Sequence, residues 1–267
     1  MPEATQTRHE HHGRYPQAAS VEDFRRNLAR VRACMDAACR RAGRDPGGVR
    51  LLPVSKTKPE QSLRLAHAAG CDLLGENKVQ EAAAKWQAMQ DLGDLRWSLI
   101  GHLQTNKAKL AARFASEFQA LDSLRVAEAL ERRLQIEGRG LDVYVQVNTS
   151  GETSKYGLAP EQVAAHLHAL KAYPALRVRG LMTLAVFSAQ AQRVRQCFIQ
   201  LRELRDRLRQ DAPAGVGLEE LSMGMSGDFE IAIEEGATVV RVGQAIFGAR
   251  PLPDSHYWPH ADTQATP

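Results

Sequence analysis

The sequence predicts an α/β protein that folds as a single (β/α)8 (TIM) barrel. The chain has 267 residues and 43% hydrophobic content, which suits one large core of the size usual for such barrels. Eight short apolar runs alternate with amphipathic stretches, and this alternation requires crossover connections and a parallel sheet. The first strand-to-helix connection is V-S-K-T-K-P. It lacks the glycine-rich phosphate loop typical of a doubly wound sheet, which is the alternative architecture.

The predicted elements follow in order along the chain. Ser20 is a good N-cap, and apolar side chains recur at helical spacing from Phe24 to Ala38, so a helix precedes the first strand. Strands are expected at 50–54, 71–75, 96–100, 118–121, 141–147, 177–184, 218–223 and 238–242. The helices between and after them are expected at 60–69, 79–89, 106–114, 123–136, 160–172, 189–210, 228–235 and 244–247. Pro53 cannot donate a ladder hydrogen bond, so we expect the first strand to be distorted or to lose one bond there.

Both ends of the chain are polar. Residues 1–19, which include His9, His11 and His12, and residues 251–267 are expected to be disordered tails around a barrel at 20–250. The three histidines are not expected to form a metal site, because a flexible end offers no packed surroundings to orient them.

Composition narrows the class of partner. The net charge is +4, which raises the question of nucleic acid binding, but the arginines alternate with acidic residues along helical faces as on a solvated surface. We therefore expect no nucleic acid partner. The four cysteines form no C-x-x-C pair, which suits a reducing cytoplasm. No apolar run approaches the length of a membrane span, so no membrane association is expected.

A lysine follows the first predicted strand, at the end of the barrel where the active site of this fold lies. Lys56 comes two residues after Val54. Loss of hydration in an apolar barrel mouth lowers the pKa of a lysine, and the neutral amine attacks aldehydes. Lys56 is therefore a candidate for an imine (Schiff base). The alternative is a surface lysine in a loop, which suits Lys58 better.

Two glycine-containing segments follow the seventh and eighth predicted strands, at 222–228 and 241–248. These loops form the usual phosphate site of a barrel, because glycines let main-chain N–H groups approach an anion. Glycine-containing turns are also common wherever a strand meets a helix. The first and eighth strands adjoin in a closed barrel, so Lys56 and these loops together predict a ligand that carries both an aldehyde and a phosphate.

Six motifs at matching spacing resemble the pyridoxal phosphate homeostasis protein family. They are L-L-P-V-S-K-T-K-P, G-E-N-K-V-Q-E, I-G-H-L-Q-T-N-K, R-G-L-M-T-L, L-S-M-G-M-S-G-D and V-R-V-G-Q-A-I-F-G-A-R. The similarity as a whole runs from about residue 24 to residue 250. The family is similar in fold to the barrel domain of alanine racemase. The resemblance implies binding of pyridoxal 5'-phosphate (PLP) without an established catalytic reaction, so no catalytic residue is assigned.

Carried over motif by motif, the resemblance implies a set of cofactor-binding residues. Lys56 would form the imine, Arg241 would face the pyridine nitrogen, and Asn77 would lie near the cofactor. The phosphate would be held by Met225, Ser226, Gly243 and Gln244. Two positions depart from the family: Ser98 stands where histidine is frequent, and Gln244 where threonine or serine is frequent. Only the main-chain N–H of Gln244 is therefore expected to serve the phosphate.

Further polar residues follow the third and fifth predicted strands. His102 and Gln104 are expected to line the barrel mouth. Lys155 and Tyr156 fall in a loop that is expected to be mobile, because no partner for either side chain is evident in the sequence.

Three functions fit these features. The first is a protein that holds PLP and limits the free aldehyde, with PLP-dependent apo-enzymes as candidate recipients. The second is a PLP-dependent racemase-like enzyme, and the third is an imine-forming aldolase acting on a phosphorylated sugar. An arginine aimed at a pyridine nitrogen has no counterpart in a sugar site, so Arg241 disfavours the third. A monomer is expected, because no second domain is evident to build the dimeric site of a barrel-type racemase.

Overall fold

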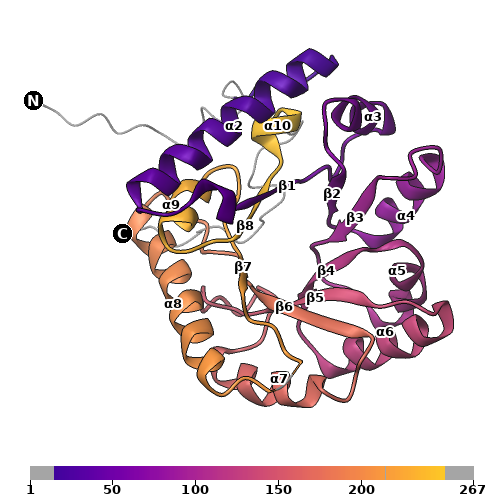
Figure 1. Ribbon diagram of the computed structural model, residues 1–267, viewed down its shortest axis with the longest axis vertical. Helices are drawn as coiled ribbons and strands as arrows, with labels where there is room; N and C mark the ends of the chain where they lie inside the picture. The colour runs from indigo at the N-terminus through magenta and orange to yellow at the C-terminus, as the bar shows by residue number, and fades with distance from the viewer. Residues whose placement is uncertain (1–14, 214, 250–267) are drawn as a thin grey trace, which may run out of the picture.

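Eight parallel strands form a ring that is surrounded by helices (Figure 1). A computed structural model describes residues 15–213 and 215–249 of the protein. The strand order is β1-β8-β7-β6-β5-β4-β3-β2, and a parallel bridge between Val54 and Gly75 joins β1 to β2 and completes the ring. The predicted (β/α)8 barrel is thus confirmed.

Each predicted strand corresponds to one observed strand, with bounds that differ by no more than two residues. The strands are β1 (Arg50–Pro53), β2 (Leu73–Glu76), β3 (Arg96–Leu99), β4 (Glu117–Leu121), β5 (Leu141–Gln146), β6 (Leu176–Met182), β7 (Glu220–Ser222) and β8 (Val239–Val242).

The predicted helices are likewise present, and two of them begin with a separate 3-10 turn. The α-helices are α2 (Val21–Arg41), α3 (Glu60–Ala68), α4 (Val79–Ala88), α5 (Ala108–Phe114), α6 (Leu124–Glu137), α7 (Val163–Leu170), α8 (Ala191–Gln210), α9 (Phe229–Glu234) and α10 (Gln244–Phe247). The 3-10 turns are η2 (Pro46–Gly48), η3 (Thr105–Lys107) and η4 (Pro160–Gln162).

Helix α2 starts where the sequence predicts it. The Ser20 hydroxyl accepts a hydrogen bond from the N–H of Asp23, and the Asp23 carboxylate accepts one from the N–H of Ser20, which is a capping box. Its buried face packs on α10, where the Phe24 and Phe247 rings meet edge to face at 5.2 Å. Helix α2 therefore supports the short helix that follows the last strand.

Pro53 weakens the β1–β2 seam, as the sequence predicts. The N–H groups of Arg50 and Val54 donate to the β8 side of β1, so the nitrogen of Pro53 faces β2. A proline nitrogen carries no hydrogen to donate. The main-chain pairing described between the two strands is a single bridge, with the N–H of Ser55 donating to the Gly75 carbonyl at 2.9 Å.

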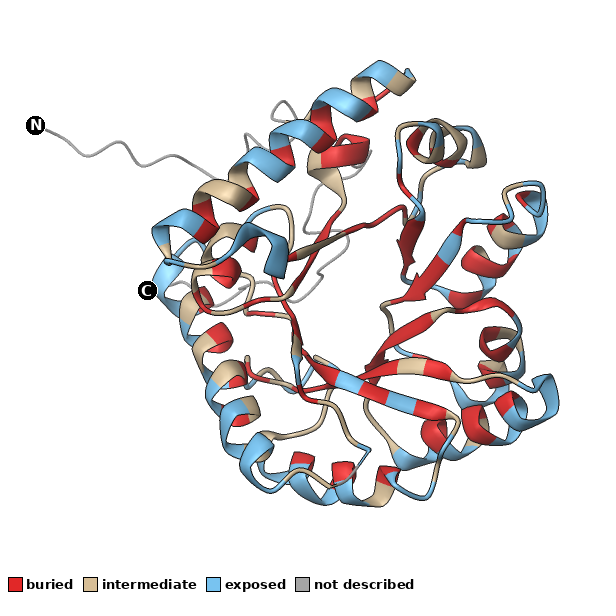
Figure 2. Cartoon of the chain, in the orientation of Figure 1, coloured by how far each residue is buried: buried red, intermediate tan, exposed pale blue. Residues whose placement is uncertain are grey.

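Burial follows the layers of the fold. Strands are buried along most of their length, whereas helices bury their inner faces and expose their outer ones (Figure 2). Among the residues that the structure describes, no helix combines the length and apolarity that a bilayer crossing requires.

The chain contacts the barrel earlier than the sequence predicts. Tyr15 to Ala19 were assigned to the N-terminal tail, yet the Tyr15 carbonyl accepts a hydrogen bond from the N–H of Ala249, and Ala18 is buried. The predicted tails at 1–14 and 251–267, including the histidines, lie outside the described residues.

Candidate functional site

A cavity of about 920 Å³ opens at the carboxyl ends of the strands. The seven residues assigned to cofactor binding lie at the carboxyl end of β8 or in the segments that follow β1, β2, β7 and β8, and all of them line this cavity. They are Lys56, Asn77, Met225, Ser226, Arg241, Gly243 and Gln244. The volume lies within the range of small-molecule sites.

The cavity wall carries an excess of positive charge. Seven lysine and arginine residues line it, against three aspartate and glutamate residues. Two of those acids already have partners: Glu81 accepts from Lys85 at 2.7 Å, and Glu152 pairs with Lys155 at 2.5 Å. A concave surface with this imbalance attracts anionic ligands.

Lys56 is held in a tight turn directly after β1. The N–H of Lys58 donates to the Ser55 carbonyl at 3.1 Å, which closes the turn around Lys56 and Thr57. Thr57 has a φ of 65°, a left-handed conformation that is strained for a β-branched residue. Its N–H donates to Glu81 Oε1 at 2.8 Å, so α4 holds the strained residue in place. The main chain at Lys56 is therefore fixed from both sides.

A buried ion pair supports the start of this turn. Lys85 Nζ donates to Glu76 Oε1 at 2.7 Å and to the Ser55 carbonyl at 3.1 Å. The Ser55 hydroxyl donates to the same Glu76 oxygen at 2.5 Å. Burial raises the pKa of Glu76, and Lys85 opposes that shift. These hydrogen bonds anchor Ser55 to Glu76 of β2 and Lys85 of α4, and Ser55 in turn holds the lysine turn.

The loops after β7 and β8 meet at the hydroxyl of Ser226. The main-chain N–H groups of Gly243 and Ala245 point to this oxygen at 3.2 and 3.5 Å. Both distances exceed those of strong N–H···O bonds, so the donors are only weakly satisfied. Two N–H groups that converge on one point can hold an oxygen of an anion.

The loop after β7 is shaped by a glycine and an aspartate. Gly224 has a φ of +93°, and a Cβ there would lie 2.6 Å from the Cβ of Ala232, so a side chain does not fit. Asp228 accepts from the N–H of Met225 at 2.5 Å, and burial raises the pKa of this carboxyl group. These contacts set the position of Met225 and Ser226.

Arg241 lies at the floor of the cavity and is 3% exposed. Its guanidinium donates to the Ser222 hydroxyl at 2.7 Å and to the Thr183 carbonyl at 2.8 Å. Burial lowers its pKa to about 10, which still leaves it charged at neutral pH. The group therefore presents a fixed positive charge to a ligand above it.

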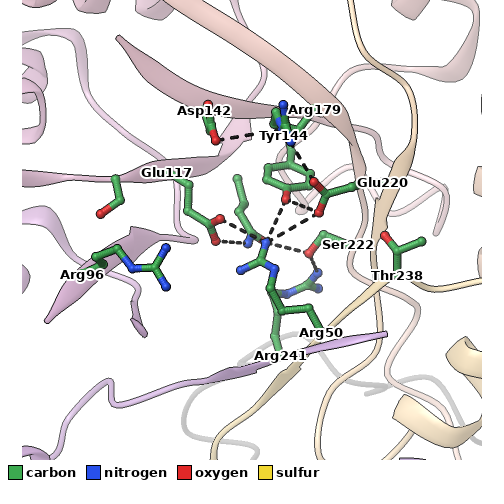
Figure 3. A network of polar contacts seen from close by, with 12 residues as sticks. Arg50, Arg96, Glu117, Asp142, Tyr144, Arg179, Glu220, Ser222, Thr238 and Arg241 are labelled. Carbon is green, nitrogen blue, oxygen red and sulfur yellow. Dashed lines mark hydrogen bonds and ion pairs between the residues drawn. The ribbon is translucent and has the colours of Figure 1, made fainter. Parts of the chain in front are cut away.

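A chain of hydrogen bonds leads from Arg241 down the barrel interior (Figure 3). The Ser222 hydroxyl donates to Gln119 Oε1 at 2.6 Å, and Gln119 Nε2 donates to Glu117 Oε1 at 2.6 Å. Because an arginine can only donate, the direction of each bond in this chain is fixed. It ends at Arg50, which donates to Glu117 Oε2 at 3.1 Å.

The wall opposite the phosphate loops is polar and aromatic. His102 and Gln104 line the cavity, as the sequence predicts. The His102 ring stacks on Tyr156 with 4.0 Å between centroids, and its Nδ1 lies 3.1 Å from Asp122 Oδ2. Lys155 donates to the Ala185 carbonyl at 2.9 Å. Both loop residues thus have partners, contrary to the expectation from sequence.

The departure at Ser98 leaves a small buried residue inside the barrel. Ser98 is fully buried beside Gly75 in the β2–β3 register, and its hydroxyl has no hydrogen-bond partner among the described residues. No imidazole is available at this position.

Sequence reasoning missed two residues of this site. Tyr15 lines the cavity although it precedes the predicted barrel, and the N–H of Ala245 joins that of Gly243. An aromatic residue in an otherwise polar tail was the only available indication of Tyr15, and nothing in the sequence marks Ala245.

Comparisons with known proteins agree on one family. The family model for the alanine racemase N-terminal domain matches residues 21–251. A Pseudomonas aeruginosa protein named pyridoxal phosphate homeostasis protein is 45% identical over 224 residues, covering 84% of this chain and 94% of that protein.

Solved structures give the same picture. PipY of Synechococcus elongatus, with PLP bound, has a TM-score of 0.74 at 37% identity, covering 84% of this chain and 100% of its own. Alanine racemase of Corynebacterium glutamicum has a TM-score of 0.63 at 17% identity, covering 89% of this chain and 64% of its own. That second likeness shows the fold alone.

Proposed function

The chain belongs to the pyridoxal phosphate homeostasis protein family, and from that premise we propose that it binds PLP reversibly and limits the free aldehyde in the cell. The observation that carries the proposal is that Lys56 lines one electropositive cavity together with Ser226 and Arg241, although these two residues lie far from it in the sequence. A ligand with an aldehyde, an aromatic nitrogen and a phosphate matches these three groups.

Lys56 is the proposed covalent anchor. Its amine would condense with the aldehyde carbon, forming a C=N bond and releasing water. The strained turn at Thr57 and the Glu76–Lys85 pair support this role, because they fix the main chain from which the amine extends. The imine conjugated to the pyridine ring is the chemistry that the cofactor supplies when bound, and it absorbs visible light.

Phosphate binding is proposed for the loops after β7 and β8. The N–H groups of Gly243 and Ala245 already converge on one oxygen, that of Ser226. A phosphate oxygen is a stronger acceptor than a hydroxyl, so it would shorten these bonds. Met225 and the main chain of Gln244 border the same point, and Asn77 lies on the wall formed by the loop after β2.

Arg241 favours holding the cofactor over using it as an electron sink. A carboxylate keeps the pyridine nitrogen protonated in many PLP enzymes, whereas an arginine can only donate a hydrogen bond to it. Arg241 would therefore leave the nitrogen of a bound cofactor unprotonated, and the ring would withdraw electrons less strongly. We propose that the resting state of the protein is a stable, slowly exchanging complex.

The setting of this activity is also a proposal. All seven assigned residues come from one chain, which supports a monomer as the binding unit. The four cysteines are free thiols, which supports a reducing cytoplasm. We expect PLP-dependent apo-enzymes to be the recipients of the released cofactor.

An absorption titration tests the proposal. Wild-type protein mixed with PLP should develop the visible imine band, and Lys56→Ala should lose it while keeping its circular dichroism spectrum. Lys58→Ala, which removes the neighbouring amine, should keep the band at saturating PLP. An unchanged band in Lys56→Ala would contradict the assignment, and a band absent from the wild type would favour a sugar-phosphate ligand.

A further inference from the structure

The segment Tyr15 to Ala19 lies outside the part of the chain that the family model matches, yet it contacts the cofactor cavity. We infer that this segment is a strap over the phosphate end of the cavity, and that Tyr15 slows the release of a phosphorylated ligand. The inference rests on the proposed function, because it names a further residue of the same site.

The strap contacts the barrel at three places around the site. At the loop after β7, the Tyr15 hydroxyl donates to the main-chain carbonyl of Ser226 at 3.3 Å. At the end of α10, the N–H of Ala249 donates to the Tyr15 carbonyl at 2.9 Å. At the loop after β1, Lys58 Nζ donates to the Gln17 side chain at 2.9 Å. One short segment therefore connects the lysine turn to the loop after β7 and to the end of α10.

Close packing shows that the strap has a fixed seat on the barrel. Gly248 has a φ of +94°, and a Cβ there would lie 2.6 Å from the Cα of Gln17 and 2.8 Å from the Pro16 carbonyl oxygen. A side chain at this position would push the strap away. The Gln17 amide also donates to the carbonyl of Ala249.

Helix α2 ties the strap to the same place from the other side. Asn27 is buried, and its side-chain amide donates to the Ile246 carbonyl at 2.9 Å. The capping box at Ser20 fixes the direction in which the chain enters the helix. Since α2 is bound to α10 and the strap leads into α2, the strap cannot move far from the phosphate loops while α2 stays packed on the barrel.

These contacts place Tyr15 at the phosphate end of the cavity. The Tyr15 hydroxyl donates to the main-chain carbonyl of Ser226. The side-chain hydroxyl of the same residue is the point where the N–H groups of Gly243 and Ala245 converge. Tyr15 also lines the cavity itself. It would act on release in two ways, by fixing the Ser226 main chain and by narrowing the exit on the phosphate side.

The test compares release of ligands with and without a phosphate. Wild type, Tyr15→Ala and Tyr15→Phe are loaded with PLP and chased with excess pyridoxine 5'-phosphate, and the decay of the imine band gives the release rate. We expect release to be about tenfold faster for Tyr15→Ala, equivalent to the loss of this hydrogen bond together with the packing of the ring, and about threefold faster for Tyr15→Phe, which keeps the ring. Pyridoxal, chased with pyridoxine, should leave all three proteins at the same rate.

Tyr173→Phe is the matched control, because Tyr173 follows α7 and does not line the cavity. It should release PLP at the wild-type rate. Equal PLP release from wild type and both Tyr15 variants would overturn the inference, as would an equal acceleration of PLP and pyridoxal. A wild type that forms no imine band would instead contradict the proposed function, and this inference with it.

Discussion

The two ends of the barrel interior use the same kinds of side chain for opposite purposes. At the amino-terminal end, Arg50 donates to Glu117 and to the Tyr144 hydroxyl, which in turn donates to Glu220 at 2.7 Å (Figure 3). At the carboxyl-terminal end, Arg241 faces a cavity in which cations outnumber acids. At the amino-terminal end the charged groups pair with one another and fill the barrel interior. At the carboxyl-terminal end the excess of positive charge suits the binding of an anionic ligand.

Burial acts in the same direction on the pKa of both arginines, but their charged neighbours differ. Burial acts to lower the pKa of Arg50, but the carboxylates of Glu117 and Glu220 outweigh it and raise the pKa above its ordinary value. Burial lowers the pKa of Arg241 to about 10, and the attraction of Asp228 offsets only part of the effect. Arg241 is therefore held at a cost in stability that its proposed role in binding would explain.

A negative charge in the phosphate loops is the largest perturbation of this arrangement. Ser226→Asp puts a carboxylate where the N–H groups of Gly243 and Ala245 converge, so it should occupy the anion position and repel PLP. We expect the dissociation constant to rise roughly a thousandfold, or about 4 kcal/mol, as for a buried charge left unpaired. Fluorescence titration measures this change. Ser62→Asp, which adds the same charge in α3, is the control and should change the affinity for PLP little. If Ser226→Asp bound PLP as tightly as the wild type, the phosphate would have to bind elsewhere.

The next largest effect should separate the two arginines. Arg50→Met leaves Glu117 buried without its cation, and we expect a loss of about 3 kcal/mol in the free energy of unfolding. This is the low end of the usual range, because the Arg50 side chain is 36% exposed. Arg241→Met should cost about 1 kcal/mol or less in the absence of cofactor, since it removes a charge that burial disfavours. Urea unfolding of both variants without PLP measures these losses. A lower free energy of unfolding for Arg241→Met than for Arg50→Met would contradict the roles given to the two arginines.

A buried histidine on the helical layer should give a smaller effect, on the pH dependence of stability, because its side chain is buried without a charged neighbour in the part of the chain that the structure describes. His166 on α7 is 6% exposed, its Nε2 has no hydrogen-bond partner among the described residues, and burial lowers its pKa from 6.5 to about 4. The unfolded chain takes up a proton below its pKa of 6.5, but the folded chain does so only near 4, so stability falls as the pH drops between these values. We expect about 2 kcal/mol to be lost between pH 7 and pH 5. Unfolding of His166→Leu should lack this component, and identical pH profiles for the two proteins would refute it.

The sequence predicted the parts of the fold that depend on local pattern. Strand bounds and the start of α2 follow from apolar periodicity and from the Ser20 cap, both of which are local properties. Lys56 and the two glycine-containing loops stand out by their positions after predicted strands, whereas the full set of seven residues came from the resemblance to the family, and all seven line the cavity.

The sequence could not predict contacts that depend on distant parts of the chain. Tyr15 reaches Ser226 across 211 positions, and Ser222 reaches Gln119 across 103. The loop at Lys155 and Tyr156 has partners from β3 and β6 connections that no local pattern announces. Such contacts arise only when the barrel closes.

Borohydride reduction with peptide mapping is the decisive test of whether Lys56 holds PLP as an imine, because reduction fixes the cofactor to the amine that carries it. Protein saturated with PLP is reduced, digested and analysed by mass spectrometry. We predict that reduction removes the visible band and leaves a single major pyridoxyl label, on the peptide that contains Lys56. A label mainly on Lys58, Lys155 or another lysine, or no label on protein that binds PLP, would contradict it.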